Sequence, residues 1–235
     1  MRYLAAIAVL AAVQAGAAGM AQAAEGLPPL FHLQVEQLEF RQGGGNAVAW
    51  EAFAWYGGDF DKALVKTEGE RGSDGAFEKA EVQLLYSRLL TPFLDIQAGL
   101  RQDFRPEPGR SLAVLGLAGE LPYGLEIDLA GFASDRGDLS ARLELEYDLP
   151  ITLDLVLQPK LELDAAVQDV PALHLGSGLT QLETGLRLRY HLSREVAPYL
   201  GIGWERKLGR TSELAEAEGE DPGSAYALVG IRFWF

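Results

Sequence analysis

The chain has 235 residues, no cysteine and a formal net charge of −14. The absence of cysteine excludes disulfide bonds and thiolate metal sites, and the negative charge disfavours a nucleic-acid partner. The same acidity is compatible with a lumen or rim that attracts cations. We therefore expect no nucleic acid among the partners of this chain.

The N-terminal segment has the features of a secretory signal peptide. Arg2 gives a short positive start, an apolar run follows it, and Ala21-Gln22-Ala23 offers a cleavage site. A membrane anchor is the alternative, but the apolar run is short and no charged stop-transfer segment follows it. The expected division is a signal peptide at residues 1–23, a short periplasmic leader at 24–30 and one domain at 31–235.

Twelve later segments alternate, fully or in part, between apolar and polar side chains, which is typical of β-strands. In residues 138–149, Leu143 and Leu145 fall on one face while Glu144 and Glu146 fall on the other. Leucine and glutamate favour helices by propensity, but a helix would scatter these charges around its surface. The predicted strands are residues 31–40, 47–56, 62–70, 76–88, 93–104, 111–120, 124–134, 138–149, 151–166, 179–192, 196–206 and 225–235.

The connections between these segments alternate in length. Short turns, such as Thr91-Pro92 and Ser193-Arg194-Glu195, follow the even-numbered strands, and mostly longer polar loops follow the odd-numbered ones. This asymmetry is typical of an antiparallel transmembrane β-barrel with both termini in the periplasm, whereas a soluble lipocalin-like barrel has fewer strands. We predict an all-β outer-membrane barrel of about 12 strands. Aromatic residues near the short turns, Trp55 and Tyr199 among them, are expected in a girdle at the periplasmic rim.

Residues 225–235 form the clearest single strand. One face is wholly apolar and the other carries Arg232. A soluble sandwich that ends in a core strand is the alternative, but several aromatic residues at a terminus are unusual there. In lipid the last strand must close against the first, because no unpaired edge survives. The strand that ends at Phe235 also resembles the signal read by barrel assembly machinery, so this machinery and outer-membrane lipid are expected partners.

Several motifs along the chain have counterparts in one family. They include Trp55-Tyr56-Gly57-Gly58-Asp59-Phe60-Asp61-Lys62, Leu157-Gln158-Pro159, Ala197-Pro198-Tyr199 and Arg232-Phe233-Trp234-Phe235. Together they resemble the copper resistance protein B family of the outer membrane, over nearly all of residues 38–235. The resemblance implies a barrel that binds or passes copper ions, with a periplasmic copper protein as a candidate partner.

The chain departs from this family before the barrel. Members often carry a Met- and His-rich stretch there, but this sequence has only His32 near the start of the barrel and no methionine after Met20. Thioether ligands, which suit Cu(I), are therefore missing from the expected mature chain. Two interpretations stay open: a copper-binding or copper-passing barrel, and a barrel without copper binding that serves as a small-ion passage or a structural protein.

His32 and Glu36 are the predicted metal ligands. They share a face of the first predicted strand with Gln34, and nitrogen and oxygen donors suit Cu(II) or zinc. Two ligands make a weak site, and a lone histidine in a strand is more often an ordinary lumen residue.

Charged side chains recur on the polar faces of the strands and are predicted to line the lumen. Buried like charges are costly, so acids and bases from neighbouring strands should pair. The alternatives are a paired lumen without a transport role and a cation-attracting passage. The predicted lumen residues are Lys66, Glu68, Glu70, Lys79, Glu81, Asp95, Arg101, Asp103, Glu126, Asp128, Arg142, Glu144, Glu146, Lys160, Glu162, Arg187, Arg189, Glu205 and Arg232.

His174 and Ser177 raise the question of an outer-membrane phospholipase, which uses a serine and a histidine on a twelve-strand barrel. Their odd-numbered spacing would turn the two side chains to opposite faces of a strand, and no G-x-S-x-G motif is present. We therefore predict that the chain is not an enzyme.

Overall fold

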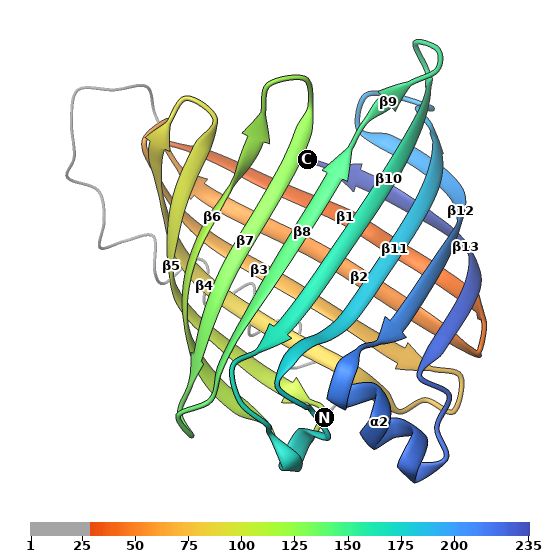
Figure 1. Cartoon of the computed structure of the whole chain (residues 1–235). Coiled ribbons are helices and arrows are strands. Elements are labelled where there is room, and N and C mark those ends of the chain that lie inside the picture. The colour runs from red at the N-terminus through yellow and green to blue at the C-terminus, as the bar shows by residue number, and fades with distance from the viewer. Residues whose placement is uncertain (1–28) are drawn as a thin grey trace.

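The computed structural model, described here over residues 29–235, is a closed barrel of twelve long antiparallel strands (Figure 1). The expected signal peptide and most of the expected leader lie outside the described residues. A two-residue strand, β9 (Leu149–Pro150), extends the turn after β8. The long strands are β1 (Leu30–Gly43), β2 (Gly45–Gly57), β3 (Asp61–Gly72), β4 (Phe77–Thr91), β5 (Leu94–Arg105), β6 (Arg110–Leu121), β7 (Leu125–Ser134), β8 (Leu139–Tyr147), β10 (Leu155–Ala166), β11 (Gly178–Tyr190), β12 (Val196–Lys207) and β13 (Gly223–Trp234).

Strands β1 and β13 close the barrel. The backbone N–H of Leu33 donates to the carbonyl of Phe235 at 3.0 Å, and the N–H of Phe235 donates to the carbonyl of Leu33 at 2.8 Å. This pairing leaves no open edge in the sheet. The C-terminus therefore lies at the end of the barrel that carries the short turns, whereas α2 lies at the opposite end (Figure 1). The antiparallel twelve-strand prediction is confirmed.

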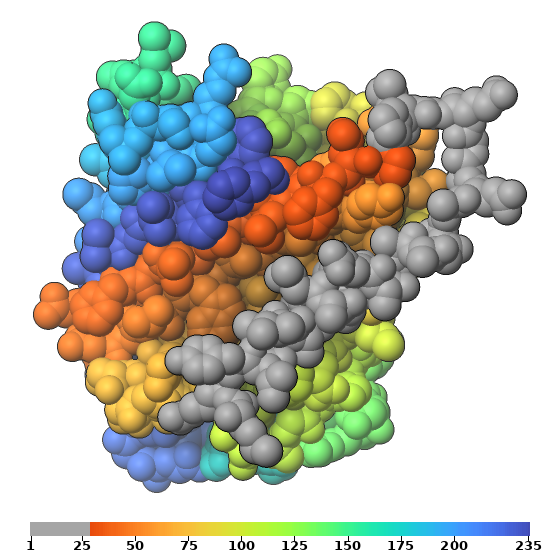
Figure 2. Space-filling model, turned by 180° about the vertical axis from the view of Figure 1, so that it is seen from behind, coloured from red at the N-terminus to blue at the C-terminus, as the bar shows by residue number. Residues whose placement is uncertain are grey.

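The two faces of the strands differ in chemistry. Large apolar side chains such as Leu100, Leu115 and Ile202 are exposed on the outside, and many polar side chains are buried inside. In Figure 2, β13, β1 and β2 run side by side across one part of this outer surface. An apolar exterior around a polar interior is the distribution of a barrel that faces lipid.

Strand β1 contains a bulge that changes which residues face inward. Its pairing with β2 shifts between Val35 and Gln37, where the sequence carries two polar residues in succession, Glu36 and Gln37. An extra residue in one strand reverses the side-chain alternation beyond it. His32, Gln34 and Glu36 therefore face the lumen before the bulge, and Gln37, Glu39 and Arg41 face it afterwards.

The loops at the long-loop end are more structured than the sequence patterns indicated. A helix, α2 (Gly209–Glu218), occupies the connection between β12 and β13, and η2 (Pro171–Leu173) is a short turn of 3₁₀-helix before β11. The backbone N–H of Gly176 donates to Thr211 Oγ1 at 3.0 Å, which joins the two loops. Within residues 29–235, no helix is long and apolar enough to cross a membrane.

Two details of the predicted strands need correction. The ninth predicted strand starts at Leu155 rather than at residue 151, because residues 151–154 form a tight turn in which Thr152 Oγ1 accepts the N–H of Leu155 at 3.0 Å. Trp55 and Tyr199 are not girdle residues. Trp55 points into the lumen. The Tyr199 side chain is buried inside the barrel against Tyr226 and Leu228. It can lie flat on the lumen wall because Gly230 on the neighbouring strand leaves room for its ring.

Candidate functional site

The lumen holds two cavities that meet near the middle of the barrel. One, of about 430 Å³, lies toward the short turns, and the other, of about 530 Å³, lies toward the long loops. Both are lined by Glu51, Glu68, Phe132 and Arg142. We call the first the short-turn cavity and the second the long-loop cavity. The boundary between them is therefore made largely of charged side chains.

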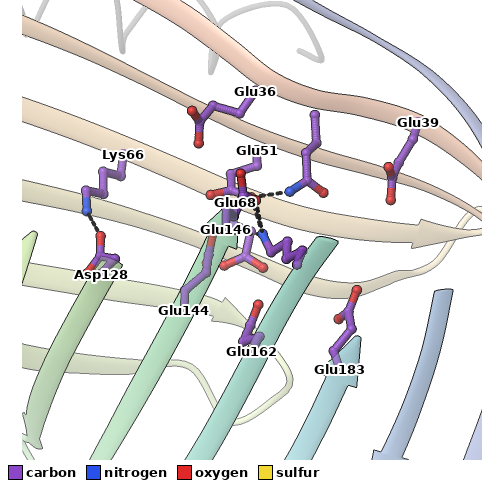
Figure 3. A network of polar contacts seen from close by, with 12 residues as sticks. Glu36, Glu39, Glu51, Lys66, Glu68, Asp128, Glu144, Glu146, Glu162 and Glu183 are labelled. Carbon is purple, nitrogen blue, oxygen red and sulfur yellow. Dashed lines mark hydrogen bonds and ion pairs between the residues drawn. The ribbon is translucent and has the colours of Figure 1, made fainter. Parts of the chain in front are cut away.

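Lys160 occupies this boundary. Its Nζ lies 3.0 Å from Glu51 Oε2, 2.8 Å from Glu144 Oε1 and 3.4 Å from Glu146 Oε1. Figure 3 shows that these three carboxylates point into the same part of the lumen from β2 and β8. One ammonium thus faces three carboxylates, which leaves an excess of negative charge around it.

Two amide side chains fix the orientation of these carboxylates. Gln37 Nε2 donates to Glu51 Oε2 at 2.8 Å, and Gln158 Nε2 donates to Glu146 Oε2 at 2.6 Å. Both amides are buried. The oxygen atoms around Lys160 are therefore held in place by the barrel wall rather than by the lysine alone.

Arg142 forms the second half of the boundary. Its guanidinium contacts Glu68 at 2.8 Å, Glu162 at 3.2 Å, Asp164 at 3.1 Å and Glu81 at 3.5 Å. These partners come from β3, β10 and β4, so the contacts reach both the neighbouring strand and the opposite wall. The prediction that lumen acids and bases pair is confirmed at this cluster.

Ion pairs fill part of the lumen along the wall formed by β11, β12, β13 and β1. Arg187 contacts Glu39 at 3.2 Å, and Arg41 joins Glu39, Glu70 and Glu183 at 2.8–3.1 Å. Neither Arg187 nor Glu39 lines either of the two lumen cavities. Side chains therefore fill the lumen around this pair, whereas nearer the long loops the same wall lines the long-loop cavity through Arg41, Glu183 and Glu205.

Sequence reasoning missed four members of the lumen network, Glu39, Arg41, Glu51 and Glu183. The bulge in β1 hid the first two, although the doubled polar pair before Leu38 marks the change of phase in the sequence. Glu51 is a single charge in an otherwise weakly alternating strand. Glu183 shares the polar face of its predicted strand with Arg187 and Arg189 but was not included in the predicted lumen set. Their partners on distant strands could not be read from local patterns.

An apolar cluster lines the side of the lumen formed by β3, β4, β6 and β7. Phe132, Leu85 and Leu112 are buried there, and Phe53 and Trp55 pack against the cluster. The Arg101 guanidinium lies over the Phe132 ring at 4.7 Å. An apolar wall lowers the local dielectric, which strengthens the ion pairs that face it.

The predicted metal ligands lie at the short-turn end. His32 Nε2 is 3.1 Å from Gln34 Oε1, and Gln34 Nε2 donates to Glu36 Oε1 at 2.8 Å, so the amide of Gln34 stands between the two predicted ligands. The His32 ring also lies within 5.7–5.9 Å of the rings of Phe53, Trp55 and Trp234. Over residues 29–235, no group of three or more His, Cys, Asp or Glu side chains is arranged to hold a metal ion.

His174 and Ser177 lie outside the lumen, in the loop between β10 and β11. His174 Nδ1 is 2.6 Å from Glu218 Oε1, and the backbone N–H of Ser177 donates to Asp169 Oδ1 at 2.8 Å. That hydrogen bond lowers the pKa of the Asp169 carboxyl, and the Ser177 hydroxyl and Arg210 lower it further. In the described part of the chain, no hydrogen bond joins the His174 and Ser177 side chains, so the pair lacks the contact that nucleophilic catalysis requires.

Solved structures with a similar fold include two porins and one enzyme of the outer membrane. The NanC porin covers 87% of this chain and 99% of its own, with a TM-score of 0.55 and 14% identity. The KdgM porin in complex with disordered oligogalacturonate gives a TM-score of 0.53 at 11% identity, over 86% of this chain and 98% of its own. Outer membrane phospholipase A from Escherichia coli gives 0.51 at 12% identity, over 85% and 92%. At these identities the similarity concerns the fold alone.

Sequence relatives are more informative. Copper resistance protein B of Escherichia coli is 43% identical over 202 residues, which is 86% of this chain and 68% of the relative. A copper resistance protein B homolog of Pseudomonas syringae pv. tomato is 41% identical over 201 residues, 85% of this chain and 68% of the relative. The family model described as copper resistance protein B precursor matches residues 30–235. The chain therefore belongs to the copper resistance protein B family.

Proposed function

We propose that this chain is an outer-membrane protein that supports copper resistance by letting copper ions pass along its lumen. The observation that carries the proposal is the continuous series of carboxylates that lines both cavities and meets at the Lys160 and Arg142 boundary. Oxygen ligands spaced along a passage allow an ion to enter, bind weakly and move on. Membership of a family named for copper resistance supports copper as the ion.

The proposed orientation places both termini in the periplasm. The start of β1 pairs with the end of β2, and β13 ends beside it, so both termini of the barrel lie with the short turns. Short turns face the periplasm in outer-membrane barrels. In this arrangement the strand that ends at Phe235 is available to assembly machinery, and a periplasmic copper protein would meet the short-turn cavity.

We also propose His32 and Glu36 as the first copper contacts of this passage. Glu36 lines the short-turn cavity, which opens at the proposed periplasmic mouth. The Gln34 side chain contacts both His32 and Glu36. Copper would enter by replacing the Gln34 amide between the imidazole and the carboxylate. Calorimetric titration of the purified barrel with Cu(II), beside His32→Ala, tests this step: binding that does not weaken in the variant overturns it.

The passage itself is tested with vesicles that contain a copper-quenched dye. Vesicles with the native barrel should take up Cu(II) faster than empty vesicles. The variant Glu144→Gln, Glu146→Gln should take it up more slowly, because two of the carboxylates at the boundary lose their charge. The matched control is Glu213→Gln on α2, an exposed glutamate far from the boundary. Native vesicles that admit no more copper than empty ones would overturn the proposal.

Growth of a deletion strain separates copper passage from a general role. Loss of the gene should make cells sensitive to copper, and the native gene should restore tolerance while the variant Glu144→Gln, Glu146→Gln should not. Equal rescue by both genes would indicate a structural role. Equal vesicle uptake of Cu(II), Mg²⁺ and Na⁺ would indicate a general small-ion passage.

A further inference from the structure

Lys160 spans the lumen rather than pairing only along the wall. It belongs to β10, and its neighbours in the sheet are β8, β9 and β11. Its partner Glu51 belongs to β2, which lies on the opposite wall of the barrel (Figure 1). A side chain that bridges opposite walls narrows the space between them.

The Lys160 ammonium also lies between the two cavities. Lys160 lines the long-loop cavity, whereas its partners Glu144 and Glu146 line the short-turn cavity. Glu51 lines both. An ion that moves from one cavity to the other therefore crosses the boundary at which Lys160 meets these three carboxylates and Arg142 meets Glu68.

The chemistry of this point favours exchange of one cation for another. The Lys160 side chain is only 5% exposed, and the carboxylates around it are oriented by Gln37 and Gln158. The ammonium is a compact point charge on a flexible stem. A divalent cation carries twice its charge and can compete for the same oxygen atoms, whereas a monovalent ion offers no electrostatic advantage over the lysine.

Arg142 is suited to a different role at the same boundary. Its planar guanidinium contacts four carboxylates on several strands, and a rigid fork with several partners is difficult to displace. Arg142 therefore forms a fixed part of the boundary between the cavities, and Lys160 is the displaceable cation beside it.

We propose that Lys160 determines which ions pass: its ammonium closes the lumen to monovalent ions, and a divalent cation opens the lumen by displacing it from Glu51, Glu144 and Glu146. The identity of that cation as copper rests on the proposed function. The gating role of Lys160 does not, because it follows from the position of the lysine between the cavities.

The absence of cysteine from the chain allows a direct test. In Lys160→Cys, the introduced thiol is the only one. It exchanges with 2-aminoethyl methanethiosulfonate, which forms a disulfide, releases methanesulfinate and restores an ammonium near the original position. Methyl methanethiosulfonate forms the same bond and leaves a neutral group. Potassium conductance of the full barrel in planar lipid bilayers is recorded before and after each reagent.

Lys160→Cys should conduct K⁺ about tenfold better than the native barrel, which corresponds to removal of a barrier of about 1.4 kcal/mol. The aminoethyl reagent should return the conductance to the native level, and the methyl reagent should not. Lys62→Cys is the matched control, because Lys62 pairs with a single carboxylate, Asp95, at 3.2 Å and lines only the short-turn cavity. This variant should differ little from the native barrel before and after either reagent.

Native-like K⁺ conductance in Lys160→Cys, or equal effects of the two reagents, would overturn the gating role. If Lys160→Cys does not fold, Lys160→Met combined with Glu144→Gln keeps the net charge of the cluster, and native-like K⁺ conductance in that variant overturns the proposal equally. If the charged reagent alone closes Lys160→Cys while native vesicles admit no copper, the gating role stands and the proposed function falls.

Discussion

Arg187 and Glu39 pair across two intervening strands. The guanidinium of Arg187 on β11 contacts the carboxylate of Glu39 on β1 at 3.2 Å, and both residues are only 2% exposed. Tyr199 Oη donates to the same carboxylate at 3.2 Å from β12. These contacts tie together the three strands β11, β12 and β1 across the closing seam of the barrel, so the pair has a structural role distinct from the ion contacts at Lys160.

Replacing Arg187 with methionine should therefore destabilise the barrel by about 3–5 kcal/mol, because the buried carboxylate of Glu39 loses a major partner. Unfolding by urea in lipid vesicles, followed by tryptophan fluorescence, measures this loss. The control is Lys207→Met, which breaks an exposed pair with Glu220 and should cost less than about 1 kcal/mol. Similar losses in the two variants would contradict the assignment.

Gly203 should resist substitution. A Cβ at this position would meet the ring of Tyr226, whose hydroxyl donates to Glu183 at 2.6 Å. Gly203→Ala should cost about 1–3 kcal/mol, the usual range for forcing extra volume into a packed interior. Gly58→Ala is the control, since a Cβ at Gly58 meets nothing within 4 Å. Equal unfolding midpoints for the two variants would show that Tyr226 moves aside freely.

The regular part of the fold could be predicted because each strand carries its own signal. Alternation identified all twelve strands, including residues 138–149, where propensity favours helix. The helix α2 was missed although Glu213, Leu214 and Ala215 are good helix formers, because the segment was treated as one polar loop. The turn at residues 151–154 was missed because Leu153 continues the alternation but is fully exposed.

The site was harder to predict than the fold. Alternation placed Lys160, Arg142 and Glu144 on the lumen face, which is confirmed. It could not show that Lys160 reaches Glu51, because that contact joins residues far apart in the sequence and on opposite walls. The metal ligands His32 and Glu36 remain a prediction. Alternation placed Gln34 between them on the same face but could not show that its amide contacts both side chains.

Asp169 should make the loop after β10 sensitive to acid. The Ser177 N–H lowers the pKa of its carboxyl below the ordinary value of 3.8, so the stabilisation is complete above that value and is lost as the pH falls through the lowered pKa. Protection of the Ser177 amide from hydrogen exchange should be high near neutral pH and should decline in strong acid. Asp169→Asn should lose part of this protection at neutral pH, and Glu213→Gln should retain it. Protection that is equal in all three proteins would contradict this role of Asp169.

Ser177→Ala should leave lipid hydrolysis at the background level of the native barrel. His174 is engaged with Glu218 rather than with the serine, and both side chains lie in an exposed loop instead of at the barrel wall. The measurement is release of fatty acid from phospholipid micelles, with and without Ca²⁺. Activity in the native barrel that disappears in Ser177→Ala would overturn the prediction that the chain is not an enzyme.

The short-turn cavity should make the barrel selective for cations. Glu36 and Glu126 both line it, and carboxylates at a mouth raise the local concentration of cations and repel anions. In planar bilayers under a KCl gradient, a barrel opened by Lys160→Cys should give a reversal potential that indicates preference for K⁺ over Cl⁻. Adding Glu36→Gln and Glu126→Gln should lower this preference severalfold, because two fixed charges at the mouth are removed.

The matched variant carries Glu213→Gln in the same opened background. It changes the net charge in the same direction but lies on α2, outside the lining of the short-turn cavity. It should leave the reversal potential unchanged. An equal shift in both variants would mean that total charge rather than the carboxylates of the mouth sets selectivity. No shift in either would place the selective step deeper, at the carboxylates around Lys160.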